Sequence, residues 1–411
     1  MGAFPQKRKS WGEVKSSLLA FKNLDTDSKH GRLTVDMHMG TEELNRVCME
    51  AYMMFFHRNA MLAEYEEGLR RMQTEILQMA VELLNGGENA RANITSGGTE
   101  SIFCAMFSAR QWARENRPEV KNPEIVIPYS GHAAFNKSGK YLDITIKRVP
   151  VGPDYRADVA AMEAAITPNT IIMVGSAPCW PFGIIDPIEE LADVAQKYGL
   201  WLHSDCCVGG YISPWLERLG YPIPVFDFRV PGVYSISADL HKHGYAAKPC
   251  STVLYRDEKL QKYHWVPVDE WPVGHYQTQS LVGSRPAGAV AAAWAVMNYL
   301  GEEGYLELAR RSMEVKKHLV NGIESIEDFA CIPNDNLLIL YSSPTLDMGC
   351  VLGGLVERGH FPFGTFDPMF VQIDAEPVSD EVVDAYLEDL REVARGVKDG
   401  TITAEALIKY G

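Results

Sequence analysis

A lysine in a short polar stretch near the middle of the chain is the residue best suited to covalent chemistry. The stretch runs Ser237-Ala-Asp-Leu-His-Lys-His-Gly-Tyr245, so that Lys242 directly follows His241, and a second lysine, Lys248, comes soon after. The residues that follow, Ser251 to Tyr255, are β-branched and aromatic and predict a strand. A lysine amine that loses its proton can form a Schiff base with an aldehyde. Lys242 is therefore the candidate for a bond to a carbonyl compound.

A pair of glycines at a predicted helix start is the candidate site for a phosphate. The stretch Asn93-Ile-Thr-Ser-Gly-Gly-Thr-Glu-Ser101 precedes an apolar run, so Gly97 and Gly98 lead into a helix. Free backbone N–H groups and the helix dipole favour an anion there, and Ser96 and Thr99 add hydroxyl donors. The stretch lacks the lysine of a P-loop and does not match GxGxxG. It therefore predicts neither a nucleoside triphosphatase nor a Rossmann dinucleotide site.

The elements that must position these residues alternate between strands and helices. Strands are predicted at residues 124–127, 170–175, 200–203 and 233–236, and helices at residues 67–84, 158–165 and 187–198. This alternation is typical of a doubly wound α/β layer with a mainly parallel sheet, in which ligands bind at the carboxyl ends of the strands. His132, Asp205 and Lys242 each follow a predicted strand end, as does the loop from Ser176 to Trp180.

The chain divides into three predicted parts. Residues 1–60 form an N-terminal arm with a short helical stripe and a helix capped by Thr41. Residues 61–300 form a large α/β domain. Residues 301–411 form a smaller α+β domain, with helices at 305–323 and 379–397 and strands at 337–341 and 370–373. The apolar run 287–297 predicts a buried helix, because it is too short to cross a bilayer.

Composition excludes several classes of protein. The net charge of 39 − 54 = −15 repels nucleic acid and anionic lipid, so an anionic substrate needs a local basic pocket. The eight cysteines are scattered without a CxxC pair or a Cys/His cluster, so no metal site is predicted. A large chain with few cysteines and no visible signal peptide predicts a location in the reducing cytoplasm.

Pyridoxal phosphate is the cofactor that needs all of these parts together. It carries a phosphate, an aldehyde, and a ring nitrogen that must stay protonated to accept electrons. The turn at 97–99 would bind the phosphate, and Lys242 would bind the aldehyde with His241 beside it. Asp205 would raise the pKa of the ring nitrogen, because a nearby carboxylate favours the charged form. The flat side chain of His132 would cover the ring.

The chain resembles the group II pyridoxal-phosphate decarboxylase superfamily and, within it, the sphingosine-1-phosphate lyases. The resemblance runs from about Gly40 to Tyr305 and implies a fold type I, transferase-like architecture. The segments that carry it are 93–101, 132–137, 175–178, 183–188, 203–205, His241-Lys242 with Lys248, and Gly283-Ser-Arg-Pro286.

The resemblance implies a role for each residue on the cofactor side. It implies that Lys242 carries the cofactor, that Asp205 holds the pyridine nitrogen and that His132 stacks on the ring. It also implies that Gly283 and Ser284 complete the phosphate site of the other subunit. The expected assembly is therefore a homodimer with shared active sites.

On the substrate side the resemblance is less regular. It implies that Lys248 contacts a substrate phosphate and that Asn59 matches the asparagine of an Asn-Pro-x-His segment, whose histidine is replaced by Leu62. His38 begins a His-Met-Gly-Thr stretch where the family has Tyr-His-Gly-Gly. Trp180 stands where the lyases have a tyrosine. These departures concern substrate binding, so we assign Lys248, Asn59, His38 and Trp180 to the substrate.

Three functions follow as hypotheses. The first is a lyase that cleaves the Cα–Cβ bond of a phosphorylated long-chain amino alcohol, such as sphingosine 1-phosphate, to an aldehyde and phosphoethanolamine. The second is an amino-acid decarboxylase that uses the same cofactor. The third is a cofactor-binding dimer with little catalysis. The sequence also lacks the membrane anchor of eukaryotic lyases, which agrees with a cytoplasmic location.

Overall fold

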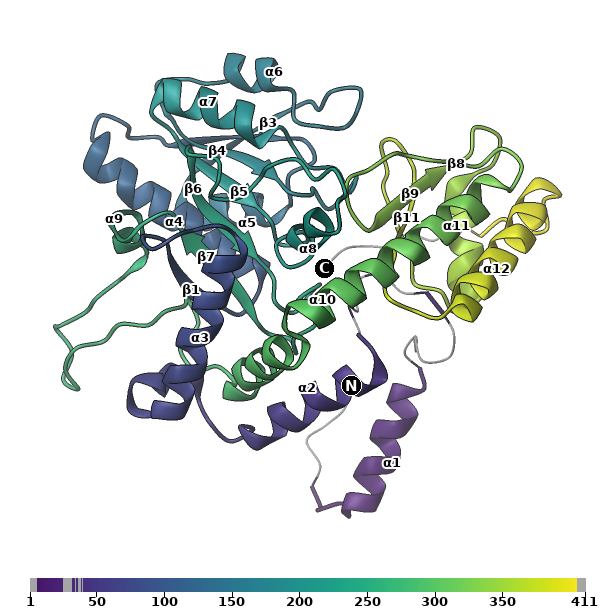
Figure 1. Cartoon of the computed structure of the whole chain (residues 1–411), viewed down its shortest axis with the longest axis horizontal. Coiled ribbons are helices and arrows are strands. Elements are labelled where there is room, and N and C mark those ends of the chain that lie inside the picture. Colours follow the sequence, from purple (N-terminus) through teal and green to yellow (C-terminus); the bar gives the residue numbers. More distant parts are fainter. Residues whose placement is uncertain (1–5, 25–31, 34, 36–37, 39, 405–411) are drawn as a thin grey trace.

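The structure, a computed structural model, describes residues 6–24, 32–33, 35, 38 and 40–404. Parts of the predicted arm and of the C-terminal end lie outside the described residues, as does Met39 of the predicted substrate segment. Figure 1 shows a large sheet surrounded by blue and teal helices, and a small sheet beside yellow helices. The long helix α10 (Ala287–Glu324) runs from one sheet to the other.

The large sheet has seven strands in the order β1-β7-β6-β5-β4-β2-β3. The five strands from β6 to β3 run parallel, whereas β7 is antiparallel to both of its neighbours. This confirms the predicted α/β class with a mainly parallel sheet. The strands are β1 (Arg91–Thr95), β2 (Glu124–Pro128), β3 (Thr145–Val149), β4 (Thr170–Ser176), β5 (Trp201–Asp205), β6 (Val233–Ala238) and β7 (Ser251–Tyr255). The sequence analysis missed β1 and β3.

Helices cover both faces of this sheet, as the side-chain alternation of β2 illustrates. Ile125 and Ile127 lie in one apolar cluster with residues of α4 and α5, whereas Val126 lies in another with residues of α3 and α7. Successive residues of a strand point to opposite faces, so both faces are buried. The helices here are α3 (Glu67–Leu83), α4 (Gly98–Asn116), α5 (Ala134–Leu142), α6 (Val159–Ala164), α7 (Ile188–Tyr198), α8 (Ser213–Arg218) and α9 (Glu258–Gln261), with short 3-10 helices at Ala60–Tyr65 and Lys262–His264.

The predicted helix ends are confirmed by their capping contacts. The hydroxyl of Thr41 accepts a hydrogen bond from the backbone N–H of Leu44 at 3.2 Å, at the start of α2 (Glu42–Met54). Asp158 caps α6 in the same way. Gly199 ends α7 with a φ of +61°, a left-handed conformation that glycine adopts without strain.

The small sheet is antiparallel, with the order β10-β11-β9-β8. Its elements are β8 (Ala330–Cys331), β9 (Leu338–Ser342), α11 (Met348–Glu357), β10 (Phe363–Gly364), β11 (Val371–Asp374) and α12 (Asp380–Lys398). The helices predicted at 287–297 and 305–323 correspond to the two parts of α10, which meet at a kink at the non-helical Gly301. The proposed domain boundary near residue 300 falls at this kink, and the three-part division stays a prediction.

The N-terminal helix α1 (Trp11–Lys22) contains the predicted helical stripe but buries none of its residues. Figure 1 shows it apart from the two sheets. By contrast, α2 packs closely on α10, because a Cβ on Gly288 would lie 2.7 Å from the backbone oxygen of Tyr52. None of the helices in the described ranges combines the length and apolar character that crossing a membrane requires.

Candidate active site

The carboxyl ends of the parallel strands border a cavity of about 330 Å³. The last residues of β4, β5 and the paired position of β6, namely Ser176, Asp205 and Ser237, are neighbours in register. Loops that leave these strands therefore converge on one place, as predicted. The predicted site residues that line the cavity are Gly97, Gly98, Thr99, His132, Trp180, Asp205, His241, Lys242 and Lys248.

Lys242 is held in this cavity by a carboxylate that the sequence analysis did not identify. The Lys242 Nζ lies 3.1 Å from the Asp239 Oδ2, and the side chains are 15% and 2% exposed. The amine also lies 5.9 Å from the ring centre of Trp180. The only signal in the sequence was the spacing, because Asp239 precedes Lys242 by three residues in a turn. This spacing is also common among residues with no functional contact.

Asp239 is fixed by a chain of buried hydroxyl groups. Its Oδ1 accepts a hydrogen bond from Ser251 at 2.5 Å, and Ser251 bonds to Ser101 at 2.8 Å, which bonds to Thr95 at 2.6 Å. Burial alone would raise the pKa of the Asp239 carboxyl, but Lys242, His241 and the Ser251 hydroxyl outweigh burial and lower this pKa. The carboxylate is therefore ionised and immobile beside the lysine.

Asp205 ends β5 with its carboxylate directed by two hydrogen bonds. Its Oδ1 accepts from the hydroxyl of Ser237 at 2.9 Å and from the backbone N–H of Cys207 at 3.2 Å. The residue is 6% exposed and lines the cavity. Such a carboxylate can hold a protonated ring nitrogen, because both bonds orient it and neither neutralises its charge.

Burial favours the neutral form of both histidines of the cavity. Burial lowers the pKa of His132, and the nearby charges of Lys242 and Arg148 lower it further. The carboxylates of Asp205 and Asp239 act in the opposite direction. The His132 Nδ1 accepts the backbone N–H of Ala134 at 3.0 Å, which leaves the proton on Nε2. Burial also lowers the pKa of His241. A neutral His132 offers a flat ring without a charge, which suits stacking on a cofactor.

The predicted phosphate turn requires glycine for steric reasons. A Cβ on Gly98 would lie 2.7 Å from the Cys207 Sγ and 2.8 Å from the Asp239 Oδ2. The helix α4 starts at this residue, and the first N–H groups of a helix have no carbonyl partner within it. Glu100 fixes the turn by accepting the backbone N–H of Ser96 at 2.6 Å. The turn thus offers an anion site at the cavity wall.

Four predicted residues do not line this cavity. The side-chain amide of Asn59 donates to the hydroxyl of Ser284 at 2.9 Å, beside Gly283, so these three residues lie together elsewhere. His38 is buried against Glu376, with the His38 Nδ1 at 2.8 Å from the Glu376 Oε1. The roles of these four residues in binding stay predictions.

A second cavity, of about 360 Å³, adjoins the first, and the sequence analysis missed it. The two cavities share His132 and Trp180. The other aromatic side chains of the second cavity are Tyr129, Phe182, Phe363 and Phe366. These come from both sheets, so no local pattern in the sequence connects them.

Comparison with known proteins identifies the family. The conserved domain of pyridoxal-dependent decarboxylases matches residues 36–340. A sphingosine-1-phosphate lyase from Arabidopsis thaliana is 41% identical over 376 residues, covering 90% of this chain and 68% of the relative. A probable L-aspartate decarboxylase from Pyrococcus abyssi is 32% identical over 397 residues, covering 96% of this chain and 100% of the relative. The chain thus spans about two thirds of the plant relative's length.

Solved structures agree with this assignment. A sphingosine-1-phosphate lyase from Burkholderia pseudomallei superposes with a TM-score of 0.91 at 31% identity, covering 98% of this chain and 94% of the other. A glutamate decarboxylase from Lactobacillus brevis has a TM-score of 0.79 at 18% identity, covering 97% and 95%, and therefore shows the shared fold alone.

These matches confirm pyridoxal phosphate as the cofactor, and the residues present fit it. Lys242 offers an amine, Asp205 a carboxylate for the ring nitrogen and His132 a flat neutral ring, all on one cavity. The glycine turn at the start of α4 leaves room that a side chain would fill. The site residues were assigned from the sequence, and the cavity brings together those on the cofactor side except Gly283 and Ser284.

Replacing Asp205 by asparagine tests its role. Asp205→Asn keeps the size of the side chain but removes the charge that holds a proton on the ring nitrogen. We expect kcat to fall at least about a hundredfold, while the visible absorbance of the bound cofactor is retained. Steady-state kinetics and absorbance spectra measure the two effects.

The matched control is Asp227→Asn. Asp227 is an equally buried aspartate that accepts from Asn85 at 2.8 Å and pairs with Arg229 at 2.9 Å, outside the cavity. This variant should unfold at a lower temperature but keep the kcat of the folded enzyme. Near-normal turnover in Asp205→Asn would show that Asp205 is structural.

Proposed function

This chain belongs to the pyridoxal-dependent decarboxylase family, and we propose that it cleaves the Cα–Cβ bond of a phosphorylated long-chain amino alcohol. The products would be a long-chain aldehyde and phosphoethanolamine, with sphingosine 1-phosphate as the model substrate. Sphingosine-1-phosphate lyases from three organisms are 37–41% identical to this chain.

The aromatic cavity next to the cofactor cavity is the observation that carries this proposal. An amino acid is small and polar and has no need of a second cavity lined by Tyr129, Phe182, Phe363 and Phe366. A long alkyl chain would gain roughly 0.8 kcal/mol for each methylene buried there. Because His132 and Trp180 border both cavities, a chain in the second cavity could start at the reacting carbon in the first.

Lys248 would bind the phosphate of the substrate. It is an exposed residue that also lines the first cavity, so its side chain can reach both solvent and substrate. A phosphate monoester carries nearly two negative charges at neutral pH, and the protein as a whole is acidic. A local cation at the edge of the cavity offsets this repulsion.

The residues of the chain divide the chemistry among them. When bound, pyridoxal phosphate supplies an aldehyde for the substrate amine and a ring that accepts the electron pair released at Cα. Asp205 would hold the proton on the ring nitrogen, and His132 would exclude water from one face of the ring. The amine of Lys242 would accept the proton of the β-hydroxyl as the Cα–Cβ bond breaks and return a proton to Cα, with Asp239 at 3.1 Å stabilising the charged form of the lysine. The aldehyde then leaves through the aromatic cavity.

Amino-acid decarboxylation is the second candidate. The observation that favours it is the match to a probable L-aspartate decarboxylase along its whole length. In that reaction Lys248 would hold a carboxylate rather than a phosphate. The two reactions differ in which bond at Cα breaks, so their products distinguish them.

We also infer that the enzyme is a homodimer with shared sites. Asn59 and Ser284 contact each other and do not line the cavity of their own chain. Exposed apolar side chains occur on α2, in the residues between α2 and α3, and just before Ser284, namely Met49, Met53, Met54, Phe56, Leu62, Leu281 and Val282. An apolar surface of this kind fits a second copy of the chain, which would bring Ser284 to the other subunit's phosphate turn. A cytoplasmic location agrees with the lack of a disulfide bond among the cysteines that the structure describes.

Lys248→Ala tests the substrate class. If the proposal holds, kcat/KM for sphingosine 1-phosphate should fall about ten- to a hundredfold, since a charged contact contributes roughly 1.5–3 kcal/mol. A free amino acid, assayed for carbon dioxide release, should be affected much less. Mass spectrometry of the products identifies the reaction in each case.

Lys197→Ala is the matched control, because it removes the same charge from the outer surface of α7, where Lys197 pairs with Glu163. Its kcat/KM should be unchanged for both substrates. An equal loss on both substrates in Lys248→Ala would point to a structural role. A loss confined to the amino acid would favour the decarboxylase instead.

Subunit mixing tests the shared site. Lys242→Ala and Ser284→Phe should each be inactive alone, because one lacks the amine and the other blocks the phosphate turn of the other subunit. Random exchange makes half of the dimers hybrid, each with one intact site, so activity should return to about a quarter of wild type.

A control pair of variants distinguishes activity regained in hybrid dimers from residual activity of the single variants. The double variant Lys242→Ala/Ser284→Phe mixed with Lys242→Ala has no intact combination and should stay inactive. Hybrid dimers that form, as native mass spectrometry can verify, but remain inactive would contradict a shared site. A fully active monomer would do the same.

A further inference from the structure

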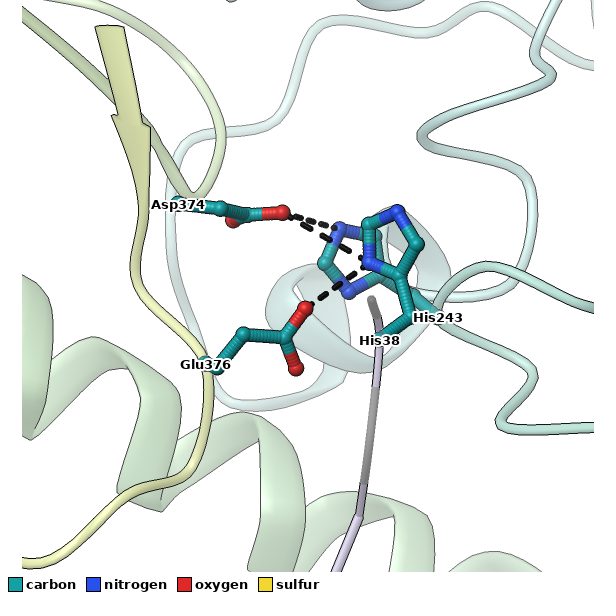
Figure 2. A group of neighbouring side chains, drawn as sticks. All are labelled: His38, His243, Asp374 and Glu376. Atoms are coloured by element: carbon teal, nitrogen blue, oxygen red, sulfur yellow. Dashed lines mark ion pairs between the residues drawn. The ribbon is translucent and has the colours of Figure 1, made fainter. Parts of the chain in front are cut away.

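Four buried side chains with metal-ligating atoms meet behind the turn that carries Lys242. They are His38, His243, Asp374 and Glu376, and their ligand atoms all lie within 4.8 Å of one another. Figure 2 shows both carboxylates directed at the two imidazole rings. The residues come from three distant segments: the N-terminal region, the turn after β6, and the end of β11 with the residues that follow.

The distances in this cluster match the edges of a metal coordination shell. The His38 Nδ1 lies 2.8 Å from the Glu376 Oε1 and 3.6 Å from the Asp374 Oδ2. The His243 Nε2 lies 3.6 Å from the same Asp374 oxygen. Ligand atoms at 2.0–2.1 Å from a tetrahedral Zn²⁺ are separated by about 3.3 Å. The three separations in the cluster bracket this value, and every pair of ligand atoms lies within 4.8 Å.

The charges of the cluster call for a cation. All four residues are at most 5% exposed, so two carboxylates lie close together in a medium that screens their repulsion poorly. Neither ring nitrogen of His243 has a hydrogen bond with any described residue.

We propose that His38, His243, Asp374 and Glu376 bind one divalent transition-metal ion, with Zn²⁺ as the expected occupant. The two carboxylates would balance the charge of a doubly charged ion, and the two imidazoles would bind it in their neutral form. Nitrogen and oxygen ligands of these types suit zinc, and four protein ligands leave no open position, which is typical of a structural rather than a catalytic site. The sequence analysis predicted no metal site, because these ligands have no short spacing that would reveal them.

Such an ion would join three parts of the molecule. It would tie the N-terminal region and the small sheet to the turn of the large sheet that carries Lys242, because His243 is the next residue. The cluster does not line the cofactor cavity, so its ligands are positioning residues. The inference is independent of the proposed substrate and can be tested without turnover.

The test is the metal content of the whole chain, purified without a histidine tag. After gel filtration in metal-free buffer, elemental mass spectrometry should find about one zinc per chain. His243→Asn and Glu376→Gln should each retain less than about a tenth, since loss of even an outer-shell partner weakens metal binding 10- to 100-fold.

His360→Asn is the matched control. His360 is a buried histidine between α11 and β10, with its Nε2 at 2.9 Å from the Asp389 Oδ2, and it contacts the N-terminal region through the N–H of Leu33. This variant should lose stability but keep its zinc. It therefore separates the loss of a ligand from general destabilisation of the region around the small sheet.

Thermal unfolding gives a second, independent readout. Zinc added to chelator-treated protein should raise the unfolding midpoint of wild type and His360→Asn, but not of His243→Asn. The proposal would be overturned if wild type contained no zinc, manganese or iron above the buffer level and its unfolding midpoint did not depend on metal. The cluster would then be a metal-free set of ion pairs. One equivalent of manganese or iron that is lost in His243→Asn would overturn the choice of zinc.

Discussion

The ion pair between Lys242 and Asp239 is the interaction on which the rest of the site depends. A buried ion pair stabilises a protein only when its desolvation is offset by good geometry and further hydrogen bonds. Here the hydroxyl chain through Ser251 and Ser101 holds the carboxylate. A side chain on Gly98 would clash with the same carboxylate. The phosphate turn can therefore approach Asp239 only because residue 98 is glycine. One contact therefore fixes the lysine, the start of α4 and β7 relative to one another.

Positive charge in this acidic protein is placed at the cofactor cavity. The chain is acidic overall, yet Lys242 and Lys248 both line the cofactor cavity, whose two histidines are kept neutral by burial. Positive charge is thus concentrated where an anionic cofactor and substrate would bind, while stacking is left to uncharged rings. The aromatic cavity continues from Trp180 and extends the apolar surface toward the small sheet.

The sequence predicted the elements with strong local signals and the residues at their ends. Strand-end positions such as Asp205 and His132 could be found because parallel strands bring their carboxyl ends to one edge. Asp239 could not be singled out, because its role beside Lys242 depends on how the residue packs against α4 and β7. His243 and Glu376 come from segments that only the tertiary fold brings together. The break at Gly301 could also be anticipated, because the helices predicted at 287–297 and 305–323 lie on either side of it.

Chemical trapping of the cofactor tests the central claim, that the amine held by Asp239 carries pyridoxal phosphate. Borohydride fixes the carbon–nitrogen bond between a lysine and the cofactor, and peptide mass spectrometry then identifies the lysine. The account predicts a single pyridoxyl label on Lys242, and no label in Lys242→Ala. A label on Lys248, or a colourless and unlabelled protein after addition of pyridoxal phosphate, would contradict it.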